Sequence, residues 1–164
     1  GNGYAITAVI GKRSIMENAN TNFISSTMWT ERIGTAAAIE CLNVMENMKS
    51  WEKISQTGIW LKDQWKKLAK IHKLKIEVQG LDAIPNFIFK SKNHNSYKTL
   101  ITQELLKKKL LATNKIFISV LHNKKNLQNY LNEMDKVFSL ISRVENGDKI
   151  ENYLKYPESF NPYI

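Results

Sequence analysis

The strongest constraint on the fold is an apolar stripe in the last third of the chain. Between residues 123 and 144, apolar side chains recur at spacings of four, three, four and three residues, at Leu127, Leu131, Met134, Phe138 and Ile141. Because an α-helix repeats every 3.6 residues, this spacing puts all five on one face. The pattern predicts a long amphipathic helix that packs one face against a core and leaves the rest in water.

Similar patterns predict the other elements of the carboxyl-terminal two thirds. Helices are expected over 33–48, 50–72 and 96–109, with a short helix over 12–18. Residues 75–78 alternate as a half-buried strand does, and a second strand is expected at 87–90 after the turn region 80–85. We expect these two strands to be antiparallel or near neighbours and a third strand at 115–120. With 164 residues, 43% of them hydrophobic, the chain is long enough for a real core.

The first residues predict a different kind of sheet. The run from Tyr4 to Ile10 is nearly continuously apolar and lies between glycines, which is typical of a strand covered on both faces in an α/β sheet. The chain supplies few neighbours for such a strand, so we expect it to be a piece of a longer protein. The character of the sequence changes near Met48 to Ser50. We therefore expect the end of an α/β domain over 1–49 and a small helix-and-strand domain over 50–164.

Charge and cysteine content exclude several classes of function. The formal net charge is +9, but the lysines are scattered along solvated helix faces instead of forming one stripe with aromatic residues, which disfavours nucleic-acid binding. The single cysteine, Cys41, excludes an internal disulfide framework. His72, His94 and His122 lack metal-ligand spacing and are interpreted as surface or capping groups, so no metal site is expected. No apolar run reaches membrane-spanning length, and a cytoplasmic protein is expected.

A hydroxyl-rich segment precedes the predicted helix at 33–48. Ser25, Ser26, Thr27 and Thr30 place four hydroxyl groups within six residues. A loop of this kind at a helix start combines side-chain donors, free backbone N–H groups and the positive end of the helix dipole, which together suit a phosphate group. The simpler interpretation, that the hydroxyl groups only cap the helix, stays open.

Three stretches together resemble the class III pyridoxal-phosphate aminotransferases, within them the glutamate-1-semialdehyde aminomutase-like branch. Residues 1–11 resemble the glycine-rich turn and strand that follow the cofactor-binding lysine in this family, and 25–34 are similar to its loop at the dimer interface. Residues 111–122 resemble a loop, strand and turn of its small domain. The resemblance covers nearly the whole chain but only the carboxyl-terminal part of such an enzyme.

The resemblance implies a fold-type I homodimer with its active site at the interface and pyridoxal 5'-phosphate as cofactor. Residues 1–49 would end the large domain, and 50–164 would form the small carboxyl-terminal α/β domain with a short, largely antiparallel sheet. Ser26 and Thr27 would donate to the cofactor phosphate of the neighbouring subunit. Trp29 and Arg32 would contact the substrate or the partner subunit, and Asn114 would face the substrate mouth.

The same resemblance assigns no catalytic residue to this chain. In the family, the lysine that forms the Schiff base, the acid that protonates the pyridine nitrogen and the aromatic residue that stacks on the ring all lie upstream of the position of Gly1. We therefore expect the 164 residues alone to be inactive, and the longer parent to transfer or shift the amino group of a small amine or carbonyl substrate. The alternative is a noncatalytic basic α+β module that binds nucleic acid or another protein.

Overall fold

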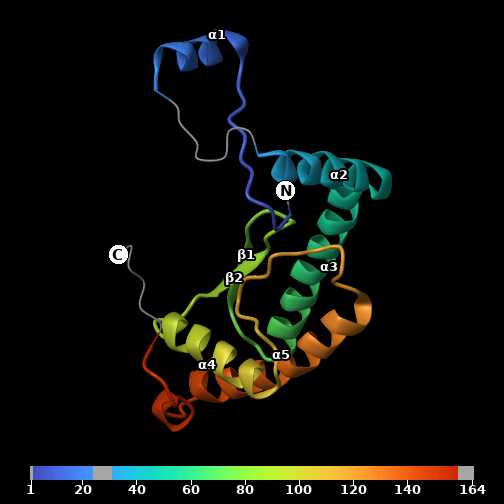
Figure 1. The fold of residues 1–164 in the computed structure, drawn as a ribbon. Helices are drawn as coiled ribbons and strands as arrows, with labels where there is room; N and C mark the ends of the chain where they lie inside the picture. Colours follow the sequence, from blue (N-terminus) through green and yellow to red (C-terminus); the bar gives the residue numbers. More distant parts are fainter. Residues whose placement is uncertain (1, 24–30, 159–164) are drawn as a thin grey trace. The chain divides into compact units, whose positions relative to one another are not determined.

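The computed structural model describes residues 2–23 and 31–158, and the chain divides into two compact units, 1–50 and 51–164. Figure 1 shows the helices and strands of both units. The first unit contains the short helix α1 (Arg13–Met16), the 3₁₀ turn η1 (Glu17–Thr21) and the helix α2 (Arg32–Met48). The helix expected at 33–48 is thus confirmed, and the short helix expected at 12–18 forms as one α-helical turn that continues into η1.

The strand expected from Tyr4 to Ile10 does not form within the described part of the first unit. This segment is extended but pairs with no strand, and Val9 and Ile10 are 73% and 89% exposed. The prediction was wrong for these residues because an apolar run becomes a buried strand only when neighbouring strands cover its edges. What the segment does contact is α2, since a Cβ atom added at Gly34 would lie 2.7 Å from the carbonyl oxygen of Ala5.

Up to residue 158, the second unit consists of three α-helices, one 3₁₀ turn and one hairpin. It contains nearly all of α3 (Ser50–Ile71), together with α4 (His94–Lys107), α5 (Lys124–Glu145) and the 3₁₀ turn η2 (Ile150–Asn152). The strands β1 (Ile76–Gln79) and β2 (Asn86–Phe89) pair in antiparallel register, with Ile76 opposite Phe89. The expected helices are confirmed, and the two strands, expected to be antiparallel or near neighbours, are antiparallel; the bounds differ from the expected ones by at most two residues.

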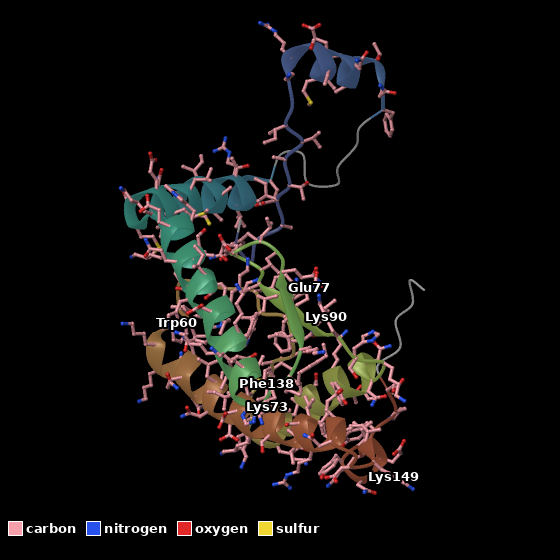
Figure 2. All side chains as sticks on the ribbon, turned by 180° about the vertical axis from the view of Figure 1, so that it is seen from behind. Trp60, Lys73, Glu77, Lys90, Phe138 and Lys149 are labelled. Atoms are coloured by element: carbon pink, nitrogen blue, oxygen red, sulfur yellow. The ribbon has the colours of Figure 1, made fainter. Side chains whose placement is uncertain are left out.

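The core of this unit lies between the hairpin and the three helices. Phe87 and Phe89 point from β2 to the same side because strand side chains alternate. Phe87 contacts Trp65 of α3 at a ring-centroid distance of 4.9 Å, and Phe89 contacts Tyr97 of α4 at 5.2 Å. Phe138 of α5, labelled in Figure 2, contacts Phe87 and Phe89 at 5.7 Å and 5.6 Å. All five residues that define the apolar stripe of α5 are buried, which confirms the prediction for this helix.

The third strand expected at 115–120 forms only in part. The segment runs beside residues 83–86, at and just before the start of β2, where the amides of Ile116 and Ile118 donate to the carbonyl oxygens of Pro85 and Ala83 at 3.1 Å and 2.9 Å. A single bridge, between Asn86 and Lys115, is regular enough to count as pairing. Because proline has no N–H group, Pro85 cannot return a hydrogen bond to this segment. The described sheet therefore has two strands.

The fold class is a mixed one, in which α-helices dominate over a small antiparallel sheet. The second unit combines helices with this antiparallel pair, and the expected domain bounds, 1–49 and 50–164, stay a prediction. The parallel α/β part of the expectation has no counterpart among residues 2–23 and 31–50. No helix in the described part of the chain is long and apolar enough to cross a membrane.

Candidate functional site

The loop predicted to bind phosphate is described only at its end. Ser26, Thr27 and Trp29 lie outside the described residues, so their predicted contacts with cofactor, substrate or partner stay predictions. Arg32 is the first residue of α2, and it is exposed. An exposed guanidinium group at this position is free to meet a carboxylate or phosphate of another molecule.

The start of α2 is capped by a carboxylate. Glu31 accepts hydrogen bonds from the backbone amides of Ile33 at 2.6 Å and Gly34 at 2.9 Å, one on each carboxylate oxygen. This cap uses two of the first-turn amides that the sequence analysis had offered to a phosphate, and its negative charge opposes a second anion there. A phosphate held by this loop would therefore depend on the side-chain hydroxyl groups and not on these two amides.

The cap also bears on whether the described residues could bind the phosphate group of pyridoxal phosphate, the cofactor implied by the resemblance. At the start of α2, two of the amides that would suit a phosphate group, those of Ile33 and Gly34, already donate to Glu31. Within residues 2–23 and 31–158, we accordingly assign no cofactor contact and no catalytic step. The same part of the chain contains no group of three or more histidine, cysteine, aspartate or glutamate side chains that could hold a metal ion.

Asn114 has a structural contact that the sequence analysis did not anticipate. Its side-chain amide donates to the carbonyl oxygen of Phe87 at 2.7 Å, and its side-chain oxygen accepts from the hydroxyl group of Thr113 at 3.1 Å. The backbone amide of Phe87 in turn donates to the carbonyl oxygen of Asn114 at 3.1 Å. Asn114 thus fastens its loop to β2, and the predicted substrate contact stays a prediction.

Two hollows in the second unit meet at His122. The first, with a volume of about 410 Å³, has a largely apolar lining that includes Leu110, Phe117 and Tyr130. The second, of about 420 Å³, lies between α3 and the start of α5 and includes Trp60 in its lining. His122 and Leu127 line both. Volumes of this size are within the range of small-molecule sites.

One polar group in the lining of the first hollow, the phenol of Tyr130, is buried. The indole N–H group of Trp65 donates to the hydroxyl oxygen of Tyr130 at 3.1 Å, and burial raises the pKa of Tyr130. Like an ordinary tyrosine, the phenol is protonated at physiological pH, and burial extends the protonated range to higher pH. Sequence analysis missed both hollows because their walls come from segments far apart in the chain, and no local motif marks them.

No protein-family model matches the chain. Among curated proteins, it is similar to 3-aminobutyryl-CoA aminotransferase of Cloacimonas acidaminovorans (strain Evry), with 28% identity over 103 residues, which are 62% of this chain and 25% of that protein. It is also similar to aminopentol aminotransferase of Sphingopyxis macrogoltabida, with 26% identity over 88 residues, which are 54% of this chain and 21% of that protein. The matched part spans about a quarter of the length of these curated relatives or less.

The fold has a counterpart among solved structures. The FumI protein of Sphingopyxis sp. MTA144, in its PLP internal aldimine form, matches with a TM-score of 0.72 and 19% sequence identity. The match covers 87% of this chain and 35% of that chain, and at this identity it shows a shared fold. Together with the two sequence matches, it confirms the resemblance on which the sequence analysis rested: the chain is a distant homologue of the class III aminotransferases.

Proposed function

We propose that this chain forms the carboxyl-terminal part of a pyridoxal-phosphate-dependent aminotransferase or aminomutase that transfers or shifts the amino group of a small amine or carbonyl substrate. The observation that carries the proposal is the fold match, which covers 87% of the chain but only about a third of the matched PLP enzyme. When bound, pyridoxal phosphate supplies an electron sink that stabilises a carbanion next to the amino group. The protein supplies binding, orientation and proton transfer.

In this proposal the two units have different tasks. Residues 1–49 end the large domain, and 50–164 form the small carboxyl-terminal domain. Ser26 and Thr27 donate to the cofactor phosphate of the neighbouring subunit in a homodimer. Arg32, exposed at the start of α2, meets a carboxylate of the substrate or of the partner subunit. The Schiff-base lysine lies on polypeptide that precedes Gly1.

The contact of Asn114 with β2 gives this residue a positioning role in the same proposal. Its hydrogen bond to Phe87 holds the loop that the resemblance places at the substrate mouth. The loop is thereby tied to the aromatic core, because Phe87 is completely buried against Trp65 and Phe138. A loop that is fixed in this way presents its side chains in one arrangement.

The test is cofactor retention by the longer parent protein. The parent should show an aldimine absorbance band, and Thr27→Val should weaken retention of pyridoxal phosphate during dialysis while the fold stays intact. Thr102→Val is the matched control, because the Thr102 hydroxyl group donates to the carbonyl oxygen of Lys98 within α4. A parent without a lysine ahead of Gly1 would refute the proposed function, and unchanged retention in Thr27→Val would refute the phosphate contact.

A further inference from the structure

We propose that the second hollow, between the amino-terminal half of α3 and the start of α5, binds a small phosphorylated ligand with a planar ring, of the nucleoside-phosphate class. This site is separate from the cofactor contacts proposed above. Its lining contains three ionisable residues, Lys53, Lys124 and His122, and none of the residues that line it is acidic. The hollow is therefore suited to an anion.

The two lysines differ from many others on this surface. Lys62, Lys67, Lys90, Lys107 and Lys136 each form an ion pair with a carboxylate, and Figure 2 labels one such pair, Lys90 with Glu77. Within residues 2–23 and 31–158, neither Lys53 nor Lys124 has an ion-pair partner. Both are exposed, so their ammonium groups can reach a ligand in the hollow. Two ammonium groups around one hollow match the charge of a phosphate dianion.

His122 adds a donor with a fixed orientation. The backbone amide of Ser119 donates to its Nδ1 atom at 2.9 Å, and the amide of His122 donates back to the carbonyl oxygen of Ser119 at 3.0 Å. A nitrogen atom that accepts a hydrogen bond carries no proton, so in the neutral ring the proton is on Nε2. The turn at 119–122 thus holds an N–H donor in the wall of the hollow.

Trp60 provides the surface for the ring. It lies on α3, is half-buried and lines the hollow, and Figure 2 shows its place on this helix. An indole ring offers a flat apolar face, and stacking of a base on an aromatic side chain contributes about 1–3 kcal/mol. The volume of about 420 Å³ is sufficient for a nucleoside with one or two phosphates. The lysines and His122 would bind the phosphates while the base stacks on Trp60.

The experiment is calorimetric titration of the 164-residue chain with ADP at low salt, with tripolyphosphate and adenosine as separate probes. We expect ADP to bind more tightly than either. Lys53→Gln, Lys124→Gln and Trp60→Leu should each raise the Kd for ADP by about fivefold or more, since each removes a charged or stacking contact. Lys149→Gln is the matched control, because Lys149 lies past the opposite end of α5 and lines no part of the hollow.

Three outcomes of this experiment would overturn the proposal. Absence of ADP binding at millimolar concentration would refute the site, and tripolyphosphate binding as tight as ADP would refute the contact with Trp60. An equal loss in Lys149→Gln would show nonspecific attraction to a basic surface. Circular dichroism of each variant checks the fold, and the two lysine variants keep the test valid if Trp60→Leu is unstable, because exposed lysines tolerate substitution.

Discussion

Gly58, in the middle of α3, should resist replacement by alanine although alanine is the better helix former. A Cβ atom added at Gly58 would lie 1.7 Å from the carbonyl oxygen of Asp82 and 2.7 Å from its carbonyl carbon. Both atoms belong to the backbone, so no side-chain rotation relieves the overlap. Reaching even 3.0 Å, the lower limit of real Cβ contacts, requires a shift of at least 1.3 Å between α3 and the loop at 80–84 (3.0 − 1.7).

Two opposing contributions set the size of the effect. Helix propensity favours alanine over glycine by about 1 kcal/mol in a helix interior. Against this, forcing extra volume into a packed contact costs about 1–3 kcal/mol and occasionally more. The shift would also strain the contacts of Lys62, one turn further along α3, which donates to the carbonyl oxygen of Gly80 at 2.6 Å and to Asp82 Oδ1 at 2.8 Å. We therefore expect Gly58→Ala to lower the free energy of unfolding by roughly 2 kcal/mol.

The assay is thermal and urea unfolding followed by circular dichroism. For a chain of this length, a loss of about 2 kcal/mol lowers the Tm by roughly 4–8 °C. Gln56→Ala is the control, because Gln56 is an exposed residue of the same helix and its replacement should change stability by less than about 0.5 kcal/mol. A Gly58→Ala variant as stable as the original chain, or more stable, would refute the close contact between α3 and the 80–84 loop.

Three further predictions concern buried polar groups. Gln103 binds the backbone of the carboxyl-terminal segment: its Nε2 donates to the Tyr153 carbonyl oxygen at 2.9 Å, and its Oε1 accepts from the Lys155 amide at 2.7 Å. Gln103→Leu removes both hydrogen bonds and should therefore speed trypsin cleavage at Lys155. Tyr130→Phe leaves the buried indole N–H group of Trp65 without its acceptor and should cost about 1–3 kcal/mol in urea unfolding; no change would mean that this group has another acceptor. Burial and the hydrogen bond to Glu145 raise the pKa of Tyr97, so stability should hold below about pH 10 and fall above it, because the unfolded tyrosine loses its proton first. Unfolding between pH 8 and 11 should show a smaller decrease in Tyr97→Phe.

Local pattern predicted most of the elements in the second unit. The apolar stripe of α5 depends only on helix geometry, and each of its five residues is buried as expected. The β1–β2 pair was predicted because two short apolar runs flank a turn region. Local pattern did not predict the cap of α2. Serine and threonine were candidate caps, but the residue that caps is Glu31, because its carboxylate reaches two amides at once.

Contacts between distant residues explain what the sequence analysis missed. Whether residues 4–10 become a buried strand depends on neighbours, which the described part of the first unit does not supply. The third strand is incomplete because Pro85, on the opposite segment, has no N–H group. The local sequence indicates only a loop at Asn114, but its side-chain amide donates a hydrogen bond to the carbonyl oxygen of Phe87 in β2. The hollow at Trp60 exists because α3 and α5 approach each other there.

The sequence by itself determined the distant family, the order of the helices and the antiparallel pair, because periodicity, turn residues and short family-like stretches are local properties. The tertiary structure alone decided which helices share the aromatic core, where Gly58 meets Asp82 and which lysines surround one hollow. The physical reason is that such contacts join residues far apart in the chain. Their geometry is set by the packing of whole elements against one another, and no local pattern encodes it.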